Sequence, residues 1–105
     1  MSITIYTPNF DDAKELQSYK REISLCLVRY GGLSEAEARQ KVATDHLFEV
    51  KNETQLMLIF HEYPYYWAMM MLYGQNNPLW YQDPKLWPPP DDYEEWLRSQ
   101  AADSE

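Results

Sequence analysis

The chain has few residues that could hold it together by covalent or metal bonds. Its 105 residues include one cysteine, Cys26, and two histidines, His46 and His61. A single cysteine excludes an intrachain disulfide, and nothing else in the sequence argues for an oxidising compartment. A site combining both histidines with Cys26 and a carboxylate is conceivable by ligand type, but the close spacing typical of metal ligands is missing. We therefore predict neither a metal site nor a cofactor.

Long apolar stretches are also missing. Residues 63–82 carry no charge at neutral pH, but the apolar part of this run ends at Gly74. It is interrupted by Pro64 and is too short to cross a bilayer. The first eight residues lack both a basic region and a long apolar stretch, so we expect no signal peptide. The sequence therefore predicts a cytoplasmic protein that does not enter a membrane.

Positive charge is scarce. Nine Lys and Arg stand against 17 Asp and Glu, which gives a formal net charge of −8. Residues 1–82 hold 10 acids and 7 bases (−3), whereas residues 83–105 hold 7 acids and 2 bases (−5). Phosphate contacts supply most of a protein's affinity for nucleic acid, so this acidity argues against direct nucleic-acid binding and against anionic membranes. It suits solubility or a basic protein partner.

Apolar residues at three- and four-residue steps predict a first helix over residues 11–30. Asn9 or Asp11 is placed to cap its start, and Gly31-Gly32 supplies a left-handed stop at its end. This helix should bury its periodic apolar face.

A second helix follows directly. Ser34 and Glu37 have the spacing of a capping box, in which each side chain satisfies a free backbone N–H at the helix start. The apolar face is narrow, and we expect the helix to run over 35–49 on the surface. Together the first two helices predict an αα-hairpin.

Pro64 interrupts the helical pattern of the central segment. Pro64 cannot donate a backbone hydrogen bond and disfavours helical conformation in the residue before it. We favour one kinked helix over 54–73, with Thr54 as its N-cap and Gly74 at its C-terminus. The alternative is two short helices joined near Glu62-Tyr63.

Two similar four- and five-residue segments follow, over 77–80 and 83–87. In each, an Asx residue precedes a proline, and a Leu-Trp pair comes next, which predicts single helical turns anchored by tryptophan. A last helix is expected over 91–100. Residues 1–10 should form an extended arm and 101–105 a frayed tail.

These elements predict an all-α protein of one domain. Its fold class is a compact irregular bundle of about four principal helices. The aromatic and proline-rich connection over 75–90 should wrap back over the third helix, because most of the aromatic side chains lie in this part of the chain.

His61-Glu62 is the one pair that suggests catalysis. The zinc-protease signature needs a second histidine at position 65, where Tyr65 stands. A general acid–base role is weakened because adjacent residues of a helix point in different directions. The carbonyl released near Phe60 by Pro64 gives a structural role instead, since His61 or Tyr63 could donate to it. We favour a protein that is not an enzyme, and keep an enzyme or ligand-binding protein using His61 and Glu62 as a third hypothesis.

Aromatic residues give the strongest functional signal. Of 16 aromatics, 11 lie between Phe60 and Trp96, more than a small helical domain can bury completely. Tyr and Trp are enriched at interfaces, so our first hypothesis is a small acidic protein–protein interaction domain that binds a protein partner or a second copy. The candidate surface consists of His61, Glu62, Tyr65, Tyr66, Trp80, Tyr81 and Trp87. The second hypothesis is an inhibitor, such as an immunity protein, an antitoxin or an acidic decoy for a basic protein.

Overall fold

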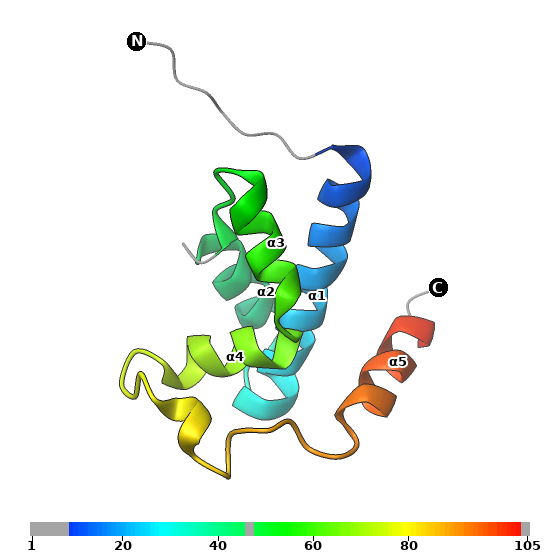
Figure 1. Cartoon of the computed structure of the whole chain (residues 1–105). Helices are drawn as coiled ribbons and strands as arrows, with labels where there is room; N and C mark the ends of the chain where they lie inside the picture. Colours follow the sequence, from blue (N-terminus) through cyan, green and yellow to red (C-terminus); the bar gives the residue numbers. More distant parts are fainter. Residues whose placement is uncertain (1–8, 46–47, 104–105) are drawn as a thin grey trace. The chain divides into compact units, whose positions relative to one another are not determined.

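The computed structural model describes residues 9–45 and 48–103, with side chains up to residue 100. Within these ranges the chain forms helices and no β-strand, so the predicted all-α class is confirmed. The α-helices are α1 (Phe10–Gly31), α2 (Glu35–Thr44), α3 (Glu53–His61), α4 (Pro64–Tyr73) and α5 (Tyr93–Asp103), and a 3₁₀ turn, η2, covers Trp80–Gln82 (Figure 1). None of the described helices is both long and apolar enough to span a bilayer.

The chain divides into two compact units, Met1–Ala68 and Met69–Glu105. The prediction of a single domain, and of a connection that wraps over the third helix, stays a prediction. Residues 1–8 of the predicted arm, His46, and residues 104–105 of the predicted tail lie outside the described residues.

Both ends of α1 are closed as the sequence predicts. The backbone N–H of Asp12 donates to Oδ1 of Asn9 at 2.8 Å, which satisfies one of the free donors at the helix start. At the other end Gly32 adopts the left-handed conformation with φ 71°. Its N–H donates to the carbonyl of Val28 at 3.1 Å, a glycine C-cap that a side chain with a Cβ would strain.

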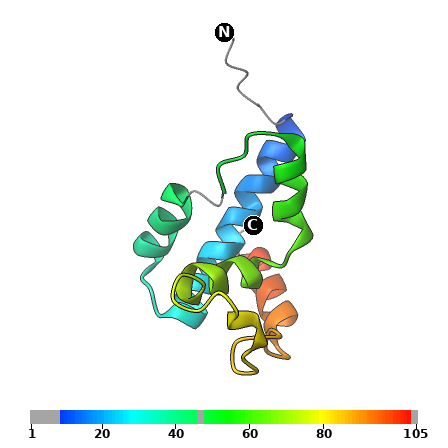
Figure 2. The ribbon, with the colours of Figure 1, turned by 60° about the vertical axis from the view of Figure 1, so that its left-hand side comes forward.

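Helix α2 begins with the predicted capping box. The N–H of Glu37 donates to Oγ of Ser34, and the N–H of Ser34 donates to Oε1 of Glu37, each at 3.2 Å. The helix ends at Thr44 instead of residue 49, because Asp45 already has an extended backbone. Thr and Asp side chains compete for backbone hydrogen bonds and favour helix ends; here Oγ1 of Thr44 donates to the carbonyl of Gln40 at 2.9 Å. Figure 2 shows α2 folded back beside α1, which confirms the αα-hairpin.

The favoured single kinked helix over 54–73 is wrong, and the alternative of two helices is confirmed. Helix α3 ends at His61, Glu62 is extended (φ −99°, ψ 157°), and α4 begins at Pro64. A proline is stable at the first position of a helix, where its missing N–H costs nothing. The predicted cap Thr54 is also wrong, because Asn52 accepts the N–H of Gln55 at 2.8 Å.

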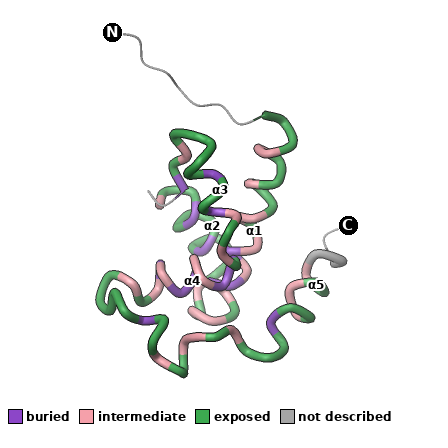
Figure 3. Tube along the Cα trace, in the orientation of Figure 1, coloured by how far each residue is buried: buried purple, intermediate pink, exposed green. Residues whose placement is uncertain are grey.

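Buried residues of the first unit lie in the middle of α1, on one side of α2 and α3, and at the start of α4 (Figure 3). The most enclosed are Ile23, Cys26 and Leu27 of α1. These apolar side chains hold the helices of the first unit together. The apolar residues buried with them are Ala38, Val42, Phe48, Leu56, Ile59, Tyr65 and Ala68.

In the second unit the two predicted tryptophan-anchored turns are present. The side-chain Oδ1 atoms of Asn77 and Asp83 each accept a hydrogen bond from the backbone N–H two residues ahead. The donors are Leu79 at 3.3 Å and Lys85 at 2.9 Å. The carbonyls of the same two residues accept again three residues ahead, each at 3.0 Å. The segment after α4 therefore contains two consecutive Asx turns. Helix α5 runs over Tyr93–Asp103 instead of 91–100, so the predicted tail is wrong for residues 101–103, which are helical.

Candidate functional site

The structure sorts the predicted surface residues by burial and by unit. His61 is exposed, Glu62 and Tyr66 are half-buried, and Tyr65 is buried; all four lie in the first unit. Trp80 is buried, Trp87 is half-buried and Tyr81 is exposed, and these three lie in the second unit.

Tyr65 belongs to the helix packing of the first unit. Its ring meets that of Tyr30 edge to face, with centroids 5.1 Å apart, and only 3% of the residue is exposed. Tyr66 packs in the same way on Trp67, at 5.2 Å. Edge-to-face pairs of this kind stabilise a core by about 1 kcal/mol beyond the area they bury. Tyr65 is therefore too enclosed to touch a partner.

The break between α3 and α4 is closed by a residue that sequence reasoning missed. Where α3 ends, the carbonyl of Ile59 loses its helical partner, and the indole N–H of Trp67 donates to it at 3.0 Å. The predicted donors, His61 and Tyr63, are both exposed instead. The indole is a donor only, and a tryptophan one turn into the helix after a proline is the signal that could have identified it.

Tyr19 is the most perturbed titratable group near this junction. Its ring packs edge to face on Phe60 at 5.6 Å. Burial is the main reason why the pKa of Tyr19 lies far above its usual range; the neighbouring Trp67 opposes this effect, and the charge of Glu62 adds to it. A phenol with so high a pKa stays protonated at physiological pH. Tyr19 therefore cannot act as a general base beside His61 and Glu62.

In the second unit, three aromatic rings form one cluster. The ring of Trp80 packs edge to face on the rings of Tyr81 and Trp87, with centroids 6.0 Å and 5.9 Å apart. Trp80 has no exposed surface, whereas Tyr81 is 42% and Leu79 is 52% exposed. We call Leu79, Trp80, Tyr81 and Trp87 the tryptophan cluster. It consists of a buried indole with exposed apolar side chains on both sides of it in the sequence.

The chain around this cluster is acidic. Residues 83–105 hold 7 acids and 2 bases, and Asp91, Asp92, Glu94 and Glu95 are all exposed. Glu94 and Glu95 lie in the first turn of α5, where carboxylates are stabilised by the helix dipole. The cluster is thus followed along the chain by a run of exposed negative charge.

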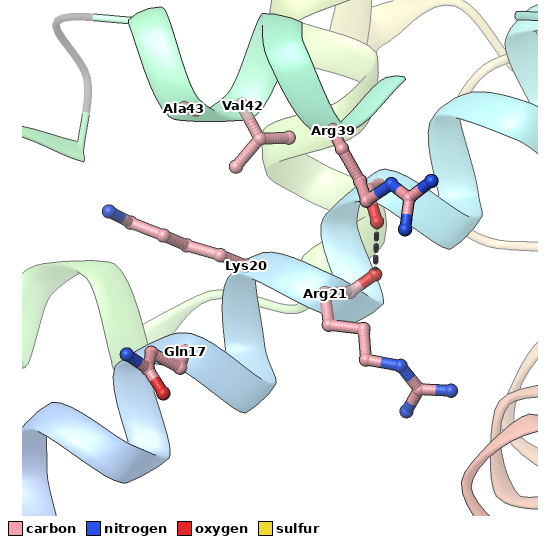
Figure 4. A pocket seen from close by; sticks show the side chains of 7 residues that line it. Gln17, Lys20, Arg21, Arg39, Val42 and Ala43 are labelled. Atoms are coloured by element: carbon pink, nitrogen blue, oxygen red, sulfur yellow. Dashed lines mark hydrogen bonds between the residues drawn. The ribbon is translucent and has the colours of Figure 1, made fainter. Parts of the chain in front are cut away.

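Two pockets of the first unit lie along the α1–α2 hairpin, at a place the sequence did not indicate. The larger has a volume of about 390 Å³ and its lining includes Lys20, Arg21 and Arg39 (Figure 4). The smaller, of about 260 Å³, shares Arg21, Ser24 and Arg39 with it. Neither His61 nor Glu62 lines them. The lining residues come from two helices, so no single stretch of sequence predicts the groove.

The possible metal ligands do not gather in the part of the chain that the structure describes. No group of three or more His, Cys, Asp and Glu side chains suitable for a metal ion occurs there. Cys26 is buried in the core while His61 is exposed. A site combining the two with His46 remains a hypothesis of the sequence alone.

Comparison with known proteins gives no family for this chain. No protein-family model, no curated protein and no solved structure matches it. Functional inference therefore depends on the chemistry of the described residues.

Proposed function

We propose that the protein is a small acidic protein–protein interaction domain of the cytoplasm that binds through the tryptophan cluster. The observation that carries the proposal is the exposure of Leu79 and Tyr81 directly beside the fully buried Trp80. Binding hot spots are typically aromatic side chains held in a fixed position by packed neighbours. Exposed Tyr81 together with half-buried Trp87 has this character.

Trp80 has a supporting role in the proposal. Because it is fully buried, it contributes no contact area of its own to a partner. Its edge-to-face contacts with Tyr81 and Trp87 restrain both rings before binding. Restraint of this kind reduces the conformational entropy lost when a complex forms.

The charge that follows the cluster along the chain bears on the partner's chemistry. Four exposed carboxylates between Asp91 and Glu95 favour a partner with basic residues around an apolar socket. Two copies that each carry a formal charge of −8 repel one another, so a basic partner suits the cluster better than homodimerisation does. The same feature favours a second candidate function, a decoy that occupies the nucleic-acid site of a basic protein.

A photo-crosslinking experiment tests the first proposal. A photoreactive phenylalanine analogue replaces Tyr81 in cells of the source organism, and the same analogue at Tyr63 is the control, because Tyr63 is 52% exposed but lies in the other unit. We expect a crosslinked protein at position 81 that does not form at position 63. Mass spectrometry then identifies the partner.

Purified components give the quantitative test. With the identified partner, Tyr81→Ala should weaken binding about 10- to 30-fold, the loss typical of an aromatic hot spot, while Tyr63→Ala leaves it unchanged. Equal crosslinking at both positions, or equal affinities of the two variants, would refute the proposal. If the partner binds nucleic acid and this protein displaces that nucleic acid, the decoy function is supported.

A further inference from the structure

Helix α1 uses two opposite faces. One face carries Tyr19 and Tyr30, whose rings pack on Phe60 and Tyr65 of the α3–α4 pair. The other face, from Gln17 through Arg21, Ser24 and Val28, lines the two pockets together with α2. All lining residues of both pockets come from α1 and α2. The pockets are therefore the open side of a two-helix hairpin, and no third element within 9–45 and 48–103 lines them.

The groove formed by these two pockets is basic in an acidic protein. Of nine Lys and Arg in the chain, Lys20 and Arg21 extend from α1 and Arg39 from α2 (Figure 4). Among the lining residues that the structure describes, Glu35 is the one acid. The groove thus has a net charge of +2, from three bases and one acid, whereas the whole chain has −8.

The floor of the groove is apolar and its polar group is satisfied. Val42 is 3% exposed and Ser24 is 6% exposed, and Leu25 and Val28 are half-buried at the side. The hydroxyl of Ser24 donates to the carbonyl of Arg21 at 2.6 Å (dashed line in Figure 4). An apolar side chain can therefore cover the floor without leaving a buried donor unpaired.

The length of the groove fits a short helix. From Gln17 to Val28 the groove follows α1 over about 16 Å at the rise of an α-helix, or roughly three turns. Two antiparallel helices with an apolar groove between them are commonly completed by a third helix, which places residues at i, i+3, i+4 and i+7 in the groove. The basic rim requires carboxylates beside that apolar stripe.

We propose that the α1–α2 groove binds an acidic amphipathic helix of a partner protein, about three turns long. The apolar stripe of that helix covers Val42, Leu25 and Val28. Its flanking carboxylates pair with Lys20, Arg21 and Arg39. The groove belongs to the first unit, whereas the tryptophan cluster belongs to the second and is followed along the chain by acids. The two therefore select partners of opposite charge.

Fluorescence anisotropy with a designed peptide tests this. The probe is a labelled helical peptide of about twelve residues with Leu at i, i+3, i+4 and i+7 and Glu on its flanks; the matched control peptide has Lys in place of Glu. We expect the full-length protein to bind the Glu peptide, with an affinity that falls as salt is raised, and to bind the Lys peptide at least about tenfold more weakly. Equal binding of the two peptides, or none of either, overturns the proposal.

Two matched variants locate the binding. Arg39→Glu reverses an exposed charge that lines the groove, while Lys41→Glu makes the same change on the same helix at an exposed residue that lines neither pocket. Arg39→Glu should weaken binding of the Glu peptide about tenfold, and Lys41→Glu less than about threefold. Equal effects would place the peptide elsewhere and overturn the proposal. Sedimentation of the protein alone tests whether a second copy of the chain binds the groove instead. Self-association that Arg39→Glu abolishes would assign the groove to that second copy and overturn the proposal.

Discussion

The two units hold their aromatic side chains in different ways. In the first unit, rings from separate helices meet, as Tyr30 of α1 meets Tyr65 of α4. In the second, Trp80 and Trp87 meet across two successive Asx turns only a few residues apart. Long-range packing encloses Tyr65 of the first unit, whereas the local turns of the second leave Tyr81 exposed. The same residue type therefore becomes core or candidate contact surface according to the backbone that carries it.

Charge separates the units as well. The groove of the first unit is lined by Lys20, Arg21 and Arg39, whereas 7 of the 9 charged residues in 83–105 are acids. A net charge averaged over the chain conceals this difference, because electrostatic recognition depends on the charges near a surface and is screened beyond about 10 Å. A single acidic chain can thus offer surfaces of both signs.

The largest effect is expected at the centre of the second unit. Trp80→Ala removes a fully buried indole and should lower the free energy of unfolding by about 3–5 kcal/mol. Urea denaturation followed by circular dichroism measures this loss. The control Tyr81→Ala truncates the exposed neighbour and should cost less than about 1 kcal/mol. Similar losses for both variants would mean that Trp80 does not support the cluster.

An intermediate effect is expected at the α3–α4 junction of the first unit. The ring centroids of Trp67 and Phe48 lie 6.0 Å apart, and Trp67→Phe keeps an aromatic ring at this contact. The substitution removes the indole N–H that donates to the carbonyl of Ile59. Leaving that carbonyl unpaired should lower the free energy of unfolding by about 1–2 kcal/mol. Hydrogen exchange at the amides of α3 and α4 should speed up in the same variant. Unchanged exchange there would show that the indole does not close the break.

The smallest effect is expected at the start of α2. Hydrogen bonds from Ser34 lower the pKa of the exposed Glu37 carboxyl. A carboxyl whose folded pKa is depressed adds stability above its unfolded pKa of about 4.3. That stability is lost as the pH falls through the lower, folded pKa.

The thermal midpoint should therefore fall less with acid in Glu37→Gln than in the unmodified protein. The comparison is made between neutral pH and a pH at which the Glu37 carboxyl is fully protonated. Glu53→Gln is a suitable control, because Glu53 also lies in a first helical turn without a capping box. Identical pH profiles for the Glu37→Gln variant and the unmodified protein would contradict the prediction.

Local features of the fold could be predicted from the sequence. The caps at Asn9, Ser34 and Gly32 depend on residues within a few positions of one another, and so do the two Asx turns. Their hydrogen bonds form wherever the right side chains follow in order. The break at Pro64 was placed correctly, but its outcome as two helices was only the alternative, because a proline permits both a kink and a new start.

Contacts between distant residues could not be predicted. Pro64 shortly before Trp67 is a local signal, but it does not show which carbonyl the indole reaches. The burial of Tyr65 depends on Tyr30, which lies on another helix. The basic groove was missed for the same reason, since Arg21 and Arg39 line one surface only after the hairpin has formed. The candidate surface inferred from composition stays a hypothesis, with Tyr81 as its most exposed aromatic member.

The division of tryptophans between the units gives the protein its own optical probes. Trp67 is the single tryptophan before Met69, and Trp80, Trp87 and Trp96 all follow it. The difference in emission between the unmodified chain and Trp67→Phe reports on the α3–α4 junction, where the indole of Trp67 donates to the carbonyl of Ile59. Emission from the unmodified chain is weighted towards the second unit. Comparison of the two signals during unfolding would follow each unit separately without an added label.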